Sequence, residues 1–514
     1  MKEIQTIEIG VDFLYNGIKE KRSVDMGKKV GIIVGVLVLL LAAAGGIYYY
    51  MTNTPKNKYL LSEKQSMETW GSYFDERFKN EVALQDEMVN ESYRGSVKLS
   101  AEVSDSLLSS LGVPASMVES TNLVFNAGHD EKNQQSELSF VPTFAGTEID
   151  KFEWTADKDA QYIAAPLFND KLMVKNADMK KVYERIAGEP APEDFDPSML
   201  NLNELMASNM TQEEAEEMQY RYLKVVMDSL EDEQFEKGKE TTDVFGKKEE
   251  LNTVTMTLED ADIKRVLKNV GAELKKDEKI KKMFGSSITS VTTKSYEESI
   301  DDLLKDIDDE KFGKIVAKNF LDGKTVVKRD INWSGADGKE DNNMLFTMTE
   351  KVDDDVQVVA ELKSSDQAAE SFRLEGTSKG KGTVKDDYTV TSITEGEEFA
   401  INMKNDEKLD GNKRTNNIDF TITDQTGETY NAKYEGTLDS DVKNNKQTSK
   451  GTISFDVDGE PIKINIDTTT NVKEKLNVKA DGAVDLNTLS DAELQELQDS
   501  IETNMEMLFS QFGA

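Results

Sequence analysis

Residues 453–466 read ISFDVDGEPIKINI, and apolar side chains occupy alternate positions on both sides of Asp458-Gly459. Such alternation is typical of a strand with one buried face, because successive side chains point to opposite faces of a sheet. Asp-Gly between two such runs favours a tight turn, since glycine adopts a positive φ at no steric cost. The stretch predicts an antiparallel hairpin.

The same alternation recurs from residue 325 to residue 480, with turn residues at a spacing of roughly 10–15 residues that suits a long antiparallel meander. A sheet of this kind twists and curls, and one face needs a cover. The cover is predicted at the C-terminus. Ser490 and Glu493 form a capping box there, and Leu494, Leu497 and Ile501 follow at helical spacing.

An earlier part of the chain shows a similar order. Met67, Trp70, Phe74 and Phe78 recur at steps of three and four, which predicts a helix with an aromatic stripe. Such a stripe normally packs in a core, and a ligand-binding surface is the alternative. Residues 97–154 then alternate with period two and predict a first antiparallel sheet.

Residues 30–50, VGIIVGVLVLLLAAAGGIYYY, hold no charged side chain. At about 1.5 Å per residue a helix of this length reaches roughly 31 Å, close to the hydrocarbon thickness of a bilayer. Cations before the stretch, Lys28 and Lys29 among them, outnumber those after it and place the N-terminus in the cytoplasm. The stretch is therefore predicted to be an uncleaved transmembrane helix. A signal peptide cleaved after Ala44 is the alternative.

These patterns predict an α+β fold: one N-terminal transmembrane helix, then two curved antiparallel β-sheets, each covered by amphipathic helices. The predicted segments are a cytoplasmic tail (1–29, of which 1–25 precede a second candidate start at Met26), the transmembrane helix (30–50), a spacer (51–58), a first sheet-plus-helix half (59–235), a helical middle segment (236–320) and a second antiparallel sheet with a C-terminal covering helix (321–514).

The composition limits the possible chemistry. The formal net charge is −37, which repels nucleic acid and anionic headgroups. The chain holds no cysteine, which excludes disulfides and thiolate metal sites. Its one histidine, His129, lies in a polar stretch and is predicted to be an exposed turn residue. We predict no catalytic residue, no metal ligand and no cofactor, and we expect the chain not to be an enzyme.

Three weaker motifs have simpler explanations. The stretch from Asp406 to Gly411 resembles the start of a calcium loop, but its third position is Lys408 and its twelfth is Asn417. Asp353-Asp354-Asp355 is predicted to be a turn between strands. The glycine-rich residues 376–382 lack the spacing of a phosphate-binding loop and are predicted to form a solvated turn.

The anchor beside Lys28-Lys29, the strand-to-helix residues 251–284 and the ending at residues 484–505 together resemble a group of uncharacterised membrane-anchored extracytoplasmic proteins of Gram-positive bacteria, which share a domain of unknown function. A curved sheet covered by helices is also similar, more distantly, to half-barrel lipoprotein carriers of the LolA/LppX type, which bind lipid in a concavity. That second likeness implies lipid binding by analogy alone.

Two functions remain open. The first is a single-pass, non-enzymatic protein of the bacterial cell envelope that lies outside the cell membrane and binds a lipid or another envelope component on a curved sheet. The second is a structural or protein-interaction module with a filled core and no ligand site. The expected partners are the membrane, through one transmembrane helix, and a lipid or envelope protein. No nucleic-acid partner is expected.

Overall fold

The structure is a computed structural model. It describes residues 54–191, 195, 197–206, 212–281, 295–335, 343–364, 370–394, 396–457 and 459–510. The predicted tail and transmembrane helix (1–50), residues 51–53 of the spacer and Asp458 of the predicted hairpin lie outside these residues. Among the helices that are described, none is both long enough and apolar enough to cross a membrane.

The described strands belong to one 21-stranded sheet. They are β1 (Tyr93–Val103), β2 (Asn122–Asp130), β3 (Gln135–Phe144), β4 (Thr147–Glu148), β5 (Phe152–Ala156), β6 (Ala160–Ala164), β7 (Leu172–Lys175), β8 (Phe235–Val244), β9 (Lys247–Leu258), β10 (Lys314–Asp322), β11 (Thr325–Ser334), β12 (Asn343–Val352), β13 (Val356–Ser364), β14 (Glu370–Lys379), β15 (Thr383–Thr394), β16 (Glu397–Asp410), β17 (Lys413–Thr423), β18 (Thr429–Asp441), β19 (Lys446–Val457), β20 (Glu460–Val472) and β21 (Val484–Asp485).

The described helices lie between and beside these strands. They are α3 (Pro55–Arg77), α4 (Lys79–Asn90), α5 (Asp105–Leu111), α6 (Ala115–Glu119), α7 (Met179–Ala187), α8 (Leu202–Met206), α9 (Gln212–Asp228), α10 (Asp260–Leu274), α12 (Tyr296–Asp309) and α13 (Asp491–Ser510), with short 3₁₀ turns η1 (Asn176–Asp178), η2 (Pro197–Leu200), η3 (Asp232–Gln234) and η5 (Val442–Asn444).

The first strand of the chain lies in the middle of the sheet, and β8 starts a second run of strands at the far edge. Strands β1, β2, β3, β5, β6 and β7 pair in that order, and β8 restarts at the opposite edge. From β8 the strands run back as a meander to β20, which pairs antiparallel with β1 from Tyr93↔Val472 to Val103↔Ile462. The β1–β20 pairing therefore joins the β8–β20 meander to strands β1–β7 in one sheet.

The prediction of two separate sheets is wrong. Strands from the expected first half and second half lie in one sheet, because β20 bonds to β1. Two sheets would have left two more rows of unpaired N–H and C=O groups, which one continuous sheet avoids. Residues 236–320, expected to be a helical middle, contain β9, β10 and most of β8 as well as α10 and α12. The meander predicted for residues 325–480 does form, as β11–β20.

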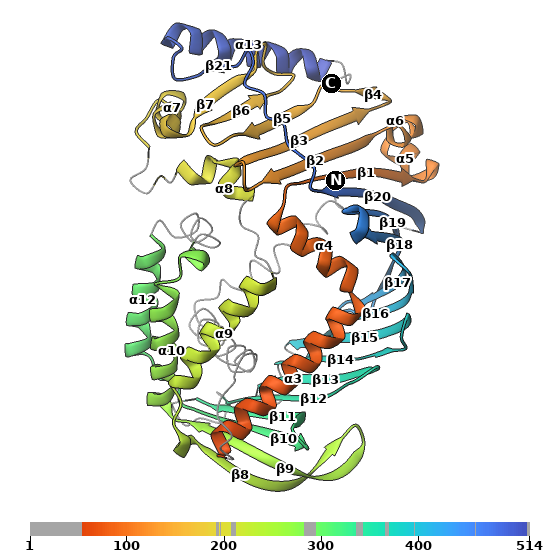
Figure 1. Cartoon of the computed structure of the whole chain (residues 1–514). Helices are drawn as coiled ribbons and strands as arrows, with labels where there is room; N and C mark the ends of the chain where they lie inside the picture. The colour runs from red at the N-terminus through yellow and green to blue at the C-terminus, as the bar shows by residue number, and fades with distance from the viewer. Residues whose placement is uncertain are drawn as a thin grey trace.

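Figure 1 shows the sheet curving around an interior, with α3 and α4 following one diagonal line across it. We call the face against which α3 and α4 pack the inner face. Helix α3 begins where Thr54 accepts a hydrogen bond from the backbone of Asn57, and Pro55 suits the first helical position. Helices α9, α10 and α12 lie together beside the β8–β11 end of the sheet (Figure 1).

The main hydrophobic core lies at that end. It joins β8–β11 to α3, α9, α10 and α12, and its least exposed side chains include Met256, Leu258, Ile263, Ile315 and Phe312. On α10, Ile263, Val266 and Val270 are buried, and Leu267 and Leu274 pack against the same core. This end of the sheet therefore has the filled core that a stable domain needs.

A smaller core lies at the opposite end, where Leu172, Val182 and Leu486 pack with side chains of α13 such as Leu494 and Leu497. The capping box of α13 is confirmed: Ser490 N donates to Glu493, and Glu493 N donates to the Ser490 hydroxyl at 3.3 Å. The prediction that this helix covers the second sheet is wrong, because it packs beside β7 and α7 of the first half. Its apolar stripe is compatible with either partner.

The aromatic stripe of α3 does not pack as a core. The buried residues of this helix are Tyr59, Leu60, Ser62, Glu63 and Ser66, whereas Phe74 is 46% exposed. The side of α3 that meets the sheet is therefore largely polar. Trp70 of the stripe reaches the sheet through a hydrogen bond to Glu350, whereas Phe74 stays partly open to solvent.

Apolar side chains of the middle strands belong to neither core in the described part of the chain. On β14, for example, Leu374 is only half-buried, and on β16 Ile401 is also half-buried. Both point to the inner face, at the same strand parity as residues that contact α3. The inner face between the two cores is thus apolar without being fully covered.

Truncation of a side chain in the core should cost much more stability than truncation on this middle face. We expect Leu258→Ala to lower the free energy of unfolding by about 2–5 kcal/mol, because it leaves a cavity in a closed core. Leu374→Ala should cost less than about 1.5 kcal/mol, since its site is already open to solvent. Urea denaturation of both variants checks this, and equal losses would show that the middle face is packed.

Candidate functional site

A buried arginine joins α3 to the inner face of the sheet. The guanidinium of Arg329 on β11 lies 2.8 Å from Glu63 of α3 and also pairs with Glu350 of β12. All three side chains are 5% exposed or less. Ser66 and Trp70 each donate to a Glu350 oxygen at 2.7 Å, so the carboxylates are held by neutral donors as well.

A second network continues the contact along the helix. Arg77 at the end of α3 pairs with Asp386 of β15 at 2.6 Å and with Glu407 of β16 at 2.9 Å. Arg414 of β17 bonds to Glu407 as well, and its Nε lies 3.0 Å from Glu81 of α4. Together the two networks fix both helices across β11–β17.

The pKa values reflect this pairing. Burial opposes the charge of Arg329, but Glu63 and Glu350 raise its pKa above the ordinary value. Arg77 shows the same balance, with Asp386 and Glu407 as its partners. Burial favours the neutral form of Asp386, yet the pKa of that carboxyl is held below its ordinary value by hydrogen bonds from Arg77, Ser378 and Asn405. Arg329, Arg77 and Asp386 are therefore charged at neutral pH.

The aromatic side chains of α3 form a stack that begins at Trp70, which bonds to Glu350. Trp70 stacks on Phe74, and Phe74 stacks on Phe78, with ring centroids 5.8 and 6.3 Å apart. At 100° per residue, Phe74 lies well around the helix from Ser72, Tyr73 and Glu76. Those three residues line a cavity against the turns at residues 353–355 and 380–382. The stack thus belongs to the other flank of α3.

On that flank the inner face carries a continuous set of apolar side chains, which we call the apolar band. It consists of Phe346 and Met348 on β12, Leu362 on β13, Phe372 and Leu374 on β14, Val390 on β15, Phe399, Ile401 and Met403 on β16, Phe420 and Ile422 on β17, Tyr430 and Tyr434 on β18, Ile453 and Phe455 on β19, Ile462, Ile464 and Ile466 on β20, Val97 and Leu99 on β1, Leu123 and Phe125 on β2, Leu138 and Phe140 on β3, Phe152 and Trp154 on β5, and Ile163 on β6.

Every member of the apolar band is partly or fully exposed. Phe372, Tyr430, Phe125, Leu138 and Ile163 range from 38% to 52% exposed, and the others are half-buried, except Val97 at 36%. Large exposed apolar surfaces on soluble domains usually mark sites that bind a partner or ligand. The apolar band is therefore the leading candidate for a functional surface.

Tyrosine rings cover glycine positions on the inner face of the sheet. A Cβ added at Gly376 would lie 2.1 Å from the ring of Tyr388, and one at Gly436 would lie 2.2 Å from the hydroxyl of Tyr434. Gly451 is equally close to the Tyr434 ring. These rings therefore lie over glycine positions, and larger residues there would push them out of the sheet surface.

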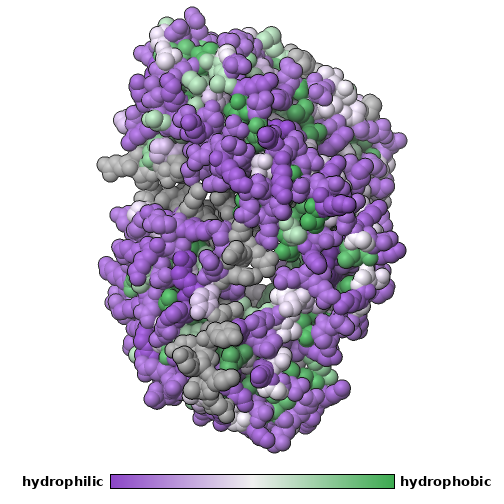
Figure 2. Space-filling model, in the orientation of Figure 1, coloured by the Kyte–Doolittle hydropathy of each residue, from purple (hydrophilic) through white to green (hydrophobic). Residues whose placement is uncertain are grey.

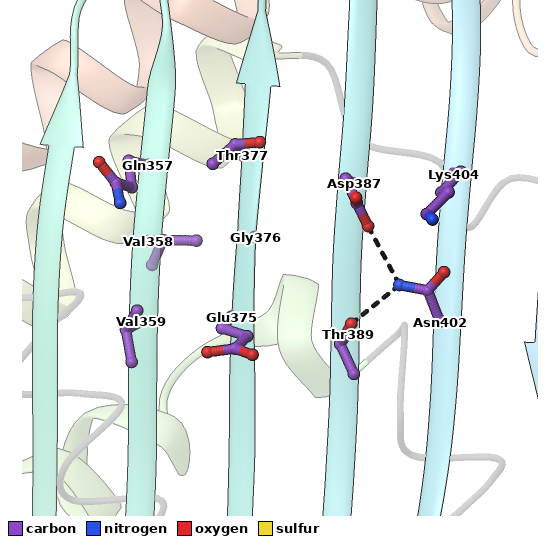
Figure 3. A pocket seen from close by; sticks show the side chains of 10 residues that line it. All are labelled: Gln357, Val358, Val359, Glu375, Gly376, Thr377, Asp387, Thr389, Asn402 and Lys404. Carbon is purple, nitrogen blue, oxygen red and sulfur yellow. Dashed lines mark hydrogen bonds between the residues drawn. The ribbon is translucent and has the colours of Figure 1, made fainter. Parts of the chain in front are cut away.

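Two cavities lie away from the apolar band and are polar. The first, beside α3, has a volume of about 1320 Å³, and its lysines are paired: Lys381 with Glu76 at 2.7 Å, and Lys351 with Asp353 at 3.1 Å. The second, of about 440 Å³, lies on the outer face of β13–β16. Figure 3 shows Asn402 there, which donates to Asp387 and Thr389. In both cavities polar groups already bond to one another.

The remaining surface matches the acidic composition. Figure 2 shows a face that is hydrophilic over most of its area, with small hydrophobic patches over the upper sheet and along its side. A charged exterior of this kind keeps a protein soluble and repels acidic ligands.

His129 differs from its prediction. It lies in β2 and is 6% exposed, with Nδ1 2.8 Å from the Ser136 hydroxyl and Nε2 2.9 Å from Glu131. Ser136 donates in turn to Asn203 at 2.6 Å and is fully buried. The cluster ties α8 to the β2–β3 hairpin, and its buried hydroxyl offers no access to a substrate.

The other sequence candidates lie in turns or in strands, and residues 376–379 of the glycine-rich stretch are part of β14. Asp353 and Asp355 form the β12–β13 turn, and Asp355 also accepts from the backbone of Gly380 at 2.8 Å. Asp406 pairs with Lys385 at 2.7 Å, near the end of β16. Within the described residues no group of three or more His, Cys, Asp or Glu side chains is arranged to hold a metal ion.

Sequence reasoning missed the three arginines that hold α3 and α4. A signal was present, because Arg329 shares the strand parity of Ile331, and Arg414 shares that of Ile418 and Phe420. A charged residue at an inward position of an alternating strand indicates a buried partner.

No family model and no curated protein matches the chain. Among solved structures it is similar to a loop-deletion mutant of OmpT, an outer membrane protein of Vibrio cholerae, with 6% identity over 74% of this chain and 98% of that one, and a TM-score of 0.17. Pseudomonas aeruginosa OpdL and OccK8 (OprE) cover the same share of this chain and 97% of their own, at 5% and 7% identity and TM-scores of 0.12 and 0.16. Such low scores support no inference about function.

The predicted localisation is not upheld by the described residues. The chain was expected to be a single-pass protein of a Gram-positive cell membrane, with a cytoplasmic N-terminus and one transmembrane helix as its membrane partner. The described residues contain no helix able to span a membrane, and residues 30–50 lie outside them. The predicted membrane anchor is therefore not carried into the functional proposal.

Removing one buried charge should be costly. Arg329→Met leaves Glu63 and Glu350 buried without their cation, and we expect a loss of about 3–5 kcal/mol in the free energy of unfolding. The matched control is Arg373→Met, whose exposed pair with Glu375 on the outer face should contribute about 0–1 kcal/mol. Denaturation curves of the two variants check the difference.

Acid should weaken the contact between α3 and the sheet. Because the pKa of Asp386 is lower in the folded chain, this carboxylate stabilises the fold above its unfolded pKa of about 3.9 and loses that contribution as pH falls through its folded value. Asp386→Asn should therefore reduce the drop in stability below about pH 4. Urea midpoints measured from pH 7 to pH 2.5 test this, with Asp387→Asn, one residue along on the outer face, as the control.

Proposed function

We propose that the chain is a non-enzymatic lipid-binding protein that holds hydrocarbon chains on the apolar band. The observation that carries the proposal is the unbroken series of half-exposed apolar side chains from β12 to β6, beside the Trp70–Phe74–Phe78 stack. Covering such side chains is favourable by about 25 cal/mol per Å² of apolar area removed from water.

The hydrogen bonding of the sheet favours a hydrocarbon over a peptide. Strands β12–β20, β1, β2, β3, β5 and β6 have neighbours on both sides, so their backbone groups are used within the sheet. A peptide on this face would bring N–H and C=O groups that need partners, and burying them unpaired is costly. A hydrocarbon chain carries no such groups.

The alternative, a structural module with a filled core, is less well supported. The buried clusters of the described chain lie at its two ends, whereas Phe372 and Phe125 of the middle face are 46% and 39% exposed. A purely structural sheet gains nothing from large apolar side chains at positions open to water.

Binding can be tested with the full chain and phosphatidylcholine, by counting bound lipid in native mass spectra. We expect wild type to retain lipid and Phe420→Glu to lose most of the binding near its site, because a carboxylate on the apolar band would have to be desolvated. The matched control is Thr421→Glu, the next residue on β17, which points to the outer face and should bind as wild type does.

Absence of bound lipid in wild type under conditions that saturate known lipid carriers would refute the proposal and favour the structural module. Equal loss in Phe420→Glu and Thr421→Glu would also contradict it, because the effect would then not depend on the inner face.

A further inference from the structure

The apolar band is much longer than one hydrocarbon chain. It continues over β12–β20 and then β1, β2, β3, β5 and β6, with every neighbouring pair in register. At about 4.8 Å between neighbouring strands its contour length is roughly 60 Å. The hydrocarbon core of a bilayer is about 30 Å thick and contains two leaflets, so one acyl chain reaches about 15 Å.

The width of the apolar band can also be compared with the length of one acyl chain. On β16 it holds three inward side chains, Phe399, Ile401 and Met403. Alternate residues on a strand are about 6.8 Å apart, so this part is roughly 14 Å wide. A chain lying along the strands would fit that width and leave most of the length free. A chain lying across the strands would cover about three or four of them.

From these dimensions we infer that the apolar band holds several lipid molecules at once, as a continuous row and not as a single pocket. The inference rests on the proposed function and extends it to the number and kind of ligand. The formal net charge of −37 disfavours anionic headgroups near this surface, so the lipids are expected to be zwitterionic or uncharged.

The ends of the row are set by the structure. At one end the inner face becomes the closed core of β8–β11, where Ile331 and Trp333 are buried. At the other end Leu172 of β7 is buried beside α13. Among the charged residues of the inner face on the described strands between these limits, Arg329, Asp386, Glu407 and Arg414 lie under α3 and α4, and Glu397 and Glu460 lie at strand ends beyond the apolar side chains. The row is therefore uninterrupted along its length.

The test titrates the full chain with phosphatidylcholine that carries a nitroxide on the sixteenth carbon of one chain, and counts immobilised label by electron paramagnetic resonance. The expected result for wild type is saturation at two or more lipids per chain. Saturation at one lipid per chain would overturn this inference and leave the proposed function intact. No immobilised label at all would overturn both.

Two substitutions at distant points test whether the row is continuous. Phe372→Glu on β14 and Phe140→Glu on β3 lie roughly 40 Å apart along the sheet, farther than one acyl chain reaches. Each should remove only part of the bound label, and the double variant should remove about the sum of both losses. A single site predicts that only one of them matters. The outer-face neighbours Ser371→Glu and Ser139→Glu are the matched controls.

Labelled phosphatidylglycerol, whose headgroup is anionic, provides the comparison for ligand class. We expect it to bind at least several-fold more weakly than the phosphatidylcholine probe at low salt, with the gap narrowing as salt screens the charge. Tighter binding of the anionic lipid would contradict the stated class.

Discussion

The contact between α3–α4 and the sheet depends on buried arginine–carboxylate pairs, and much of the structure follows from it. Arg329 lies between Glu63 and Glu350, and Arg77 lies between Asp386 and Glu407. Removing two charges from water is expensive, and such pairs add less stability than apolar packing of the same size would. Their geometric requirements are strict, however, so they fix the position of the helix more narrowly than an apolar contact would.

That position divides the inner face. On one flank of α3 lies the polar cavity beside the turns at residues 353–355 and 380–382, and on the other lies the apolar band. Had the aromatic stripe of α3 packed onto the strands, the side chains of Phe420 and Ile401 would have had a partner within the chain. Instead, Trp70 bonds to Glu350 and the Arg414 guanidinium lies 4.6 Å from the centre of the Phe78 ring, so these aromatic residues meet polar groups of the sheet and Phe74 stays partly exposed.

The alternating strands, the meander and the capped helices could be predicted from the sequence, because strand parity and helix spacing are local properties. The joining of β1 to β20 could not, since any edge strand can pair with any other and no pattern in Tyr93–Val103 names its partner. The packing partners of the helices could not be predicted either, because the apolar stripe of α13 could pack equally well on the meander or on β7. Only part of the site could be predicted from the sequence. Its apolar residues were read as sheet core, and the inward parity of Arg329 and Arg414 went unused.

The β1–β20 pairing also determines when the sheet can be completed during synthesis. Strand β1 leaves the ribosome long before β20, and until β20 arrives one edge of β1 has no lasting partner. Pairing over so great a sequence distance is slow, and open strand edges invite association with other chains. Strand β1 carries Arg94, Lys98 and Glu102 on its outer face, and charges on an exposed edge discourage such pairing. The nascent chain thus contains its own protection for the interval before the sheet is complete.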